Sequence, residues 1–160
     1  MSVAGTTAYY TSSKSVTIPR NNMTVSVWFK TTTAADQYIL NDSAGTLMSL
    51  YQNHVRFCIG APTNFCTPTA YAPGMTVVND GKWHFATFVG DKKSTRMYVD
   101  GVNTAEITGP ISTAVGTGTV GSSFTGLVDD VFIFNRALTA QEVQKLYAGE
   151  LEKQASVAKR

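Results

Sequence analysis

Residues 80–101 of the chain read DGKWHFATFVGDKKSTRMYVDG, and this stretch decides the fold. Two apolar runs, 82–89 and 96–99, flank the polar turn Asp91-Lys92-Lys93-Ser94, which predicts two neighbouring strands. The second run ends at Asp100-Gly101, and an Asp-Gly pair between strands is typical of a two-residue type I′ turn, because both central residues need a positive φ. The stretch therefore predicts an antiparallel sheet in which residues 102–107 return beside 96–99.

Further strands are predicted on the N-terminal side of this stretch. Residues 23–30 alternate strictly, with the apolar residues from Met23 to Phe29 at odd positions and therefore on one face. Pro19 cannot donate to a central ladder, so the run 15–18 is expected at a sheet edge. The run 8–11 is likewise expected to be an edge strand, and turn residues separate further short runs at 38–41, 47–51 and 55–59, which indicates a meander.

The C-terminal part predicts one more buried strand and a single helix. The strand is 127–134, and a weak strand near 114–120 precedes it. Thr139 followed by Glu142 forms a capping box, and Leu138 faces Val143 as a hydrophobic staple, so the helix is expected to begin at Ala140. Its buried face is expected to consist of Val143, Leu146 and Tyr147.

Length and composition favour one β-rich domain and exclude several classes of protein. The 160 residues suit one core, and 22 threonines with only 15% charged residues favour strands. Apolar runs such as Val131-Phe132-Ile133-Phe134 are too short to span a membrane, and a net charge of +2 from scattered basic residues argues against nucleic acid. We predict a domain over residues 1–149 and a tail, 150–160, with apolar residues at helical spacing.

Three segments carry a resemblance to a known family. They are 24–30; 80–101, with its Asp-Gly-x-Trp-His and Tyr-Val-Asp-Gly motifs; and 126–143, where Gly-x-Val-Asp-Asp precedes the capped helix. Together they resemble the LamG-like (laminin G and pentraxin-type) branch of the concanavalin A-like lectin/glucanase superfamily over about residues 3–148. The resemblance implies an all-β fold, a two-sheet antiparallel jelly-roll sandwich with one short C-terminal helix. In many relatives the concave face and rim loops bind glycans or proteins.

The resemblance also raises the question of calcium. Many relatives hold Ca²⁺ between acidic residues near the N-terminus and an Asp-Asp pair in the late strand, which here is Asp129-Asp130. The N-terminal acidic positions are Ala4 and Ala8 in this chain, and Ca²⁺ usually takes six or more oxygen ligands. We therefore predict no cofactor, with Ca²⁺ at Asp129 as the alternative.

No catalytic pattern is visible, so we predict that the chain is not an enzyme. Glycan hydrolases of the superfamily need two carboxylates about 5–9 Å apart, yet no predicted strand carries carboxylates two residues apart. His54 and His84 are expected to be ordinary strand histidines without an acidic neighbour at ligand spacing.

Aromatic residues supply the candidate ligand contacts. Trp28 and Trp83 occupy strand positions that usually pack between the sheets in the family, so they are expected in the core rather than at a ligand. Aromatic faces are natural platforms for sugars. The better candidates for a binding surface are Tyr9, Tyr10, Tyr51, Phe65 and Tyr71.

Cys58 and Cys66 bracket a seven-residue stretch at a strand end, where a loop brings the sulfurs together. We predict a disulfide, which contributes about 2–3 kcal/mol by the loop-entropy estimate. The alternative is a pair of small, partly buried thiols.

Function is predicted from the fold and the chain start together. Met1 opens the domain without a visible secretory signal, which favours a non-catalytic binding or structural module at a virion surface, made in the host cytoplasm. A phage capsid decoration, fibre or tail-associated protein fits this description, with a glycan or protein surface, capsid or tail proteins and copies of itself as partners. The alternative is an extracellular carbohydrate-binding module cut from a larger glycosidase or adhesin.

Overall fold

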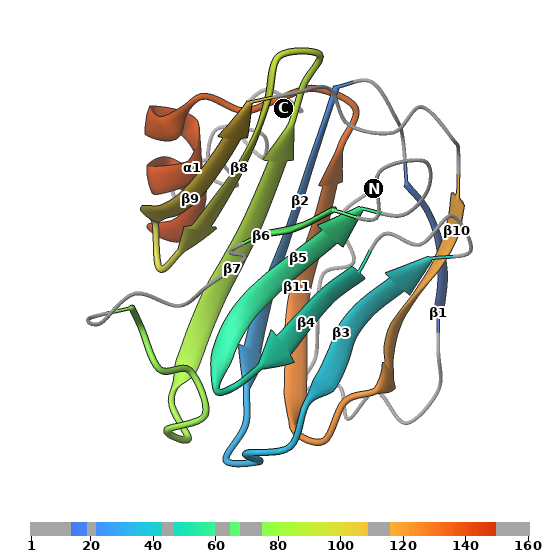
Figure 1. Ribbon diagram of the computed structural model, residues 1–160, viewed down its shortest axis with the longest axis vertical. Coiled ribbons are helices and arrows are strands. Elements are labelled where there is room, and N and C mark those ends of the chain that lie inside the picture. The colour runs from blue at the N-terminus through green and yellow to red at the C-terminus, as the bar shows by residue number, and fades with distance from the viewer. Residues whose placement is uncertain are drawn as a thin grey trace, which may run out of the picture.

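The protein is a sandwich of two antiparallel sheets with one helix on the outside (Figure 1). The computed structural model describes residues 14–18, 22–42, 47–59, 65–67, 75–108 and 116–149. Every strand pairing within the two sheets is antiparallel. The predicted all-β jelly-roll architecture is confirmed.

The first sheet has six strands, and its pairing explains one strand that the sequence did not predict. Its order is β1 (Lys14–Ile18), β10 (Gly116–Ser123), β3 (Gln37–Asp42), β4 (Leu47–Tyr51), β5 (His54–Ile59) and β6 (Phe65–Thr67). The prediction that the strand before Pro19 lies at an edge is confirmed. The three-residue β6 lies in a stretch for which the sequence analysis predicts no strand, and it exists through its pairing with β5.

The second sheet has five strands and contains the hairpin predicted from residues 80–101. Its order is β11 (Leu127–Phe134), β2 (Met23–Lys30), β7 (Trp83–Gly90), β8 (Ser94–Val99) and β9 (Val102–Thr108). Asp100 and Gly101 connect β8 to β9 with φ of 51° and 78°, which confirms the predicted turn.

The main core lies between the two sheets. Val25, Val27 and Phe29 of β2 point into it, as the strict alternation of that strand predicts. Phe88 of β7 stacks against Phe57 of β5, with ring centroids 3.4 Å apart, and so joins the two sheets. The sandwich therefore closes on a continuous apolar layer.

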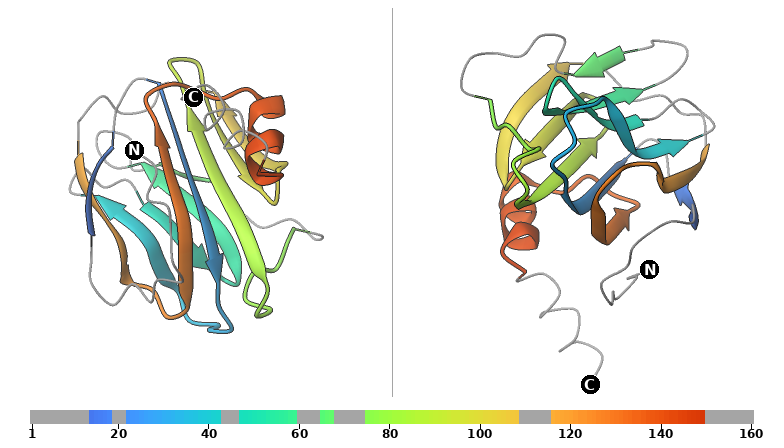
Figure 2. Two further views of the ribbon diagram at one scale, coloured as in Figure 1. Left: turned by 180° about the vertical axis from the view of Figure 1, so that it is seen from behind. Right: turned by 90° about the horizontal axis from the view of Figure 1, so that it is seen from below.

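A second, smaller core lies on the outer face of the five-stranded sheet, under the helix. Helix α1 (Ala140–Tyr147) begins at the predicted capping box, in which the Glu142 N–H donates to the Thr139 hydroxyl and the Thr139 N–H donates back to Glu142. Figure 2 shows α1 against the five-stranded sheet. Its core consists of Phe85, Val89, Tyr98, Leu138, Val143 and Leu146.

One expected member of the helix's buried face lies elsewhere. Tyr147 is 39% exposed, although the helical spacing places it in the apolar stripe. Tyr147 ends the helix, and its ring stacks on Trp28 with centroids 5.5 Å apart and lies 6.0 Å from the Phe85 ring. The prediction that Tyr147 is buried was wrong. The Trp28 ring already covers the sheet under this end of the helix, so Tyr147 stacks on that ring instead of entering the core.

Candidate functional site

Within the part of the chain that the structure describes, no helix covers the outer face of the six-stranded sheet. Among the elements that the structure describes, α1 is the only helix, and it covers the other sheet (Figure 2). Tyr38 of β3, Ser49 of β4 and Arg56 of β5 lie side by side in the strand register, so their side chains share one face. Tyr51 lies two residues beyond Ser49 and points to the same side. We call these four residues the tyrosine–arginine face.

Aromatic and cationic groups meet on this face. The guanidinium carbon of Arg56 lies 4.6 Å from the centroid of the Tyr51 ring, which is a cation–π contact. Tyr38 is 44% exposed, the most exposed aromatic side chain in the part of the chain that the structure describes. Arg56 Nε is buried and has no hydrogen-bond partner among the described residues. The N–H groups of the Arg56 guanidinium can donate to the oxygens of a sugar, and the phenol rings on this face can cover its C–H faces.

The structure describes only part of the predicted contact set. Tyr51 lies at the end of β4 rather than in a loop, and Phe65 opens β6 with only its backbone described. Tyr9, Tyr10 and Tyr71 lie outside the described residues. The contact role of all five stays a prediction.

Sequence reasoning missed Tyr38 and Arg56 on the same face. The signal was present in the alternation of residues 54–57, which reads His-Val-Arg-Phe and places Arg56 opposite the buried Val55 and Phe57. The pairing of β3, β4 and β5 places Tyr38 on the same face, with Ser49 between Tyr38 and Arg56. Only the fold provides this pairing.

A second polar cluster surrounds His84 at the start of β7. The His84 Nδ1 atom lies 2.8 Å from Asp100 Oδ2, and Nε2 lies 3.0 Å from Asp80 Oδ1, while the side chain is only 8% exposed. The expectation that His84 has no acidic neighbour was therefore wrong. Asp100 follows β8, and its approach depends on the pairing of β7 with β8, which the local sequence does not show.

Both carboxylates of this cluster also accept hydrogen bonds from other groups of the protein. Asp100 Oδ1 accepts the Phe85 N–H at 2.8 Å. Asp80 accepts from the backbone and the ammonium of Lys82, and these bonds, with the bond to His84, hold the pKa of Asp80 well below its ordinary value. The cluster acts as a clamp on residues 80–84.

The candidate calcium ligand Asp129 lies in a bulge of β11. The register of β11 against β2 shifts after Asp129, and Asp130 adopts a positive φ of 44°. The Asp130 N–H donates to Asp129 Oδ1, while burial, with the nearby Asp129 charge, raises the pKa of Asp130. The described residues contain no group of three or more acidic, histidine or cysteine side chains placed to hold a metal. Ala4 and Ala8 lie outside them, so the calcium question stays a prediction.

Cys58 and Cys66 are joined by a disulfide bond in the structure. They are direct neighbours across β5 and β6, which places the bridge at the edge of the six-stranded sheet. The bond ties the shortest strand of that sheet to β5.

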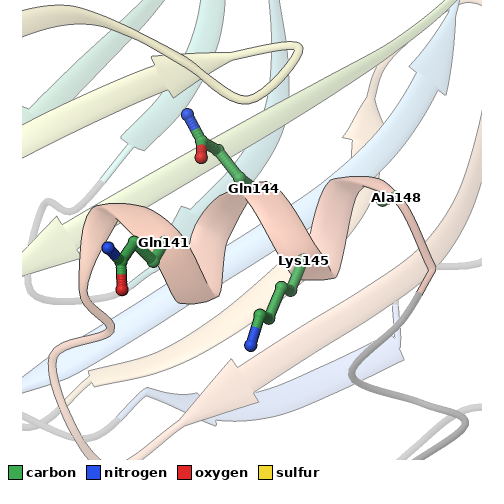
Figure 3. A pocket seen from close by; sticks show the side chains of 4 residues that line it. All are labelled: Gln141, Gln144, Lys145 and Ala148. Carbon is green, nitrogen blue, oxygen red and sulfur yellow. The ribbon is translucent and has the colours of Figure 1, made fainter.

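A shallow pocket lies on the outer side of α1 (Figure 3). Its described lining is Gln141, Gln144, Lys145 and Ala148, all from the helix and its C-cap. One ammonium and two amides from a single helix supply no carboxylate pair, so this pocket does not suggest glycan hydrolysis.

Across the described ranges of the chain, no helix has the length and apolar character needed to cross a membrane.

Comparison with protein families gives one match that covers most of the chain. A family model described as the concanavalin A-like lectin/glucanases superfamily matches residues 4–144. A comparison with curated protein sequences found no match.

Solved structures with the same fold include receptor-binding domains of botulinum neurotoxins. The binding domain of neurotoxin DC in complex with rat synaptotagmin II matches with a TM-score of 0.67 and 14% identity, over 82% of this chain and 36% of that one. The serotype D binding domain matches with a TM-score of 0.65 and 15% identity, over 88% and 42%. A DC domain in complex with SialylT matches with a TM-score of 0.66 and 15% identity, over 85% and 39%. The chain thus spans less than half of each domain, and the likeness shows the fold alone.

Proposed function

The chain belongs to the concanavalin A-like lectin/glucanase superfamily, and from that premise we propose that it is a non-catalytic module that binds a glycan or a protein surface. The observation that carries the proposal is the tyrosine–arginine face. It combines an exposed phenol, a cation–π pair and an arginine Nε without a partner among the described residues.

The chemistry of this face favours a glycan over an apolar protein segment. Sugars present C–H faces for aromatic rings and hydroxyl or carboxylate oxygens for a guanidinium. Tyr38, Ser49 and Arg56 project from three paired strands, so the groups are held by a rigid sheet rather than by loops. Two of the matched toxin domains are in complex with rat synaptotagmin II and with SialylT, which supports a binding role of this fold.

The test is a screen of the purified protein on a panel of immobilised glycans, followed by titration of the best ligand by calorimetry. Arg56→Ala and Tyr38→Ala should each weaken binding about tenfold or more, as central contacts usually do. Lys92→Ala, an exposed change in the β7–β8 turn, is the matched control and should bind like the unaltered protein. Wild-type affinity in both sheet variants would show that this face is not the binding site.

We also propose that the module works at a virion surface, with a secreted carbohydrate-binding module as the alternative. The Cys58–Cys66 bond supports a place outside a reducing cytosol, because disulfides persist in oxidising surroundings. A virion released by lysis and a secreted chain both meet this condition. Purification of the native protein separates them: co-purification with a particle supports the first, and recovery as part of a glycosidase or adhesin supports the second.

A further inference from the structure

The sequence analysis expects Trp83 to pack between the two sheets. In the structure, it lies instead on the outer face of the five-stranded sheet. It pairs in register with Lys30, whose neighbour Phe29 points into the main core, so Lys30 and Trp83 point outward. Trp83 is 39% exposed. Trp28 is on the same outer side, where it packs with the helix core. Both tryptophans therefore lie on the helix side of this sheet, and only Trp28 is covered.

A row of aromatic residues leads from the end of α1 through the buried Phe85 to the exposed Trp83. Tyr147 stacks on Trp28, and the Trp28 ring lies 5.0 Å from that of Phe85. Phe85 and Trp83 are two residues apart on one strand and share a face. Trp83 is the member of this row farthest from the helix, and it makes no ring contact with another described aromatic residue.

The backbone that carries Trp83 is held in place. The Gly81 N–H donates to the Thr31 carbonyl at 3.0 Å, and the Lys82 N–H donates to Asp80 at 2.9 Å. His84, the next residue, is clamped between Asp80 and Asp100. A ligand that stacks on Trp83 would therefore meet a platform that loses little freedom on binding.

A free cation lies beside this platform. Among the described residues, Lys30 forms no ion pair and does not sit over an aromatic ring, whereas Lys82 is paired with Asp80 at 2.9 Å. Asp129 is in register with Trp28, diagonal to Lys30, and its Oδ1 accepts the Asp130 N–H. The Lys30 ammonium is thus available to an external anion, next to an exposed indole.

We propose that Trp83 and Lys30 form a second glycan site, which takes a pyranose that carries a carboxylate. The sugar ring stacks on the Trp83 indole, and its carboxylate pairs with the Lys30 ammonium. A terminal sialic acid and a uronate within a chain both offer this chemistry. The site is on the opposite sheet from the tyrosine–arginine face, and it shares with the proposed function only the ligand class.

The test follows the two tryptophan indole N–H signals by NMR, assigned with Trp83→Phe. The probes are 3′-sialyllactose and trigalacturonate, with lactose as the neutral control. We expect a saturable shift of the Trp83 signal with at least one acidic sugar, and the two probes tell which source of the carboxylate fits. Lys30→Met, which keeps an apolar stem of similar length, should weaken that binding about tenfold, the usual value of a charged hydrogen bond.

Three outcomes would overturn the site: no shift with any probe at millimolar concentration, equal affinity for lactose, or unchanged acidic-sugar binding in Trp83→Ala and Lys30→Met. Trp83 is partly exposed, and the melting temperature of each variant checks that the fold is intact. Tyr38→Ala and Arg56→Ala should leave the Trp83 response unchanged. The same two variants test the proposed function, so failure of one site is distinguishable from failure of the other.

Discussion

His84 joins two segments of the chain that lie sixteen residues apart. Its ring lies between two carboxylates, with Nδ1 2.8 Å from Asp100 Oδ2 and Nε2 3.0 Å from Asp80 Oδ1. His84→Ala should lower the free energy of unfolding by about 1–3 kcal/mol, because it leaves two neighbouring carboxylates without their shared partner. Urea unfolding monitored by fluorescence measures this change.

Lys82→Ala is the matched control for this prediction. Lys82 also contacts Asp80, but its side chain is 79% exposed, and exposed ion pairs contribute little. Its effect should be clearly smaller than that of His84→Ala. Equal stability of His84→Ala and the unaltered protein would show that the clamp is dispensable.

For single residues, the sequence predicted which side chains of a strand face the core better than it predicted which distant residues those side chains contact. The alternation from Met23 to Phe29 correctly predicts which residues of β2 face the core, because alternation is a local property of a strand. The orientation of Trp83 and the neighbours of His84 depend on which strands pair, and on what covers the outer sheet face. The orientation of Trp83 and the approach of Asp100 to His84 come from strand pairing, which a local pattern does not show, whereas Asp80 is only four residues from His84 and was missed for lack of a local motif.

Among the elements, α1 depends on a few polar contacts at its start. Hydrogen bonds from the Arg136 guanidinium, and then from the Thr139 backbone, lower the pKa of Glu142 from 4.5 to about 2. Since the folded pKa lies below the unfolded value, Glu142 stabilises the fold fully above pH 4.5, and this contribution is lost as the pH falls toward 2.

Glu142→Gln should therefore lower the melting temperature at pH 7 but have less effect at pH 3. The loss at neutral pH is expected to be about 0.5–2 kcal/mol, as for other helix caps, because the side chain is partly exposed. Thermal unfolding across this pH range tests the expectation. Gln144→Glu, on the exposed side of α1, is the control, and a parallel pH response of Glu142→Gln and the unaltered protein would contradict the assignment.

Strand β6 is the element for which covalent chemistry matters most. It has three residues, and its described support is the pairing with β5 and the Cys58–Cys66 bond. We expect no free thiols on titration of the oxidised protein under denaturing, non-reducing conditions. Replacement of both cysteines by serine should destabilise the protein by about 2–3 kcal/mol, the entropy contribution of a short loop. Two titratable thiols in the mature protein would contradict the bond.

The elements also show where sequence patterns suffice. The Asp100-Gly101 turn and the start of α1 were predicted because each depends on residue types within a few positions. Strand β6 was missed because three residues between sequence stretches that contain Pro62 and Pro68 carry no periodic signal, and the pairing with β5 alone defines the strand.

For the whole molecule, calcium dependence is open to a direct test. Ala4 and Ala8 stand where relatives carry acidic residues, and the described residues around Asp129 provide no cluster of metal ligands. An ion that binds only the folded state raises the free energy of unfolding, and well above its Kd this increase grows with the logarithm of the ion concentration. We expect the melting temperature to stay the same with millimolar CaCl₂. A rise that a chelator reverses and that Asp129→Ala abolishes would establish a calcium site.

The segment 150–160, outside the described residues, is expected to attach the molecule to a partner rather than to complete the sandwich. Leu151, Ala155 and Ala158 keep helical spacing, although eleven residues seldom hold a helix alone in water. Deletion of 150–160 should leave the melting temperature nearly unchanged and abolish assembly onto the parent particle or oligomer. Normal assembly of the truncated protein would place the contact on the sandwich.

The position of α1 gives the molecule a front and a back. The helix ends at Tyr147 on the outer side of the five-stranded sheet, which is the back, and the six-stranded sheet that carries the tyrosine–arginine face forms the front (Figure 2). A support that holds the protein at the back would display the front to the surroundings. The same support would face the side of the sheet that carries Trp83, so anchoring close to the protein would compete with the capture of an acidic sugar at the back.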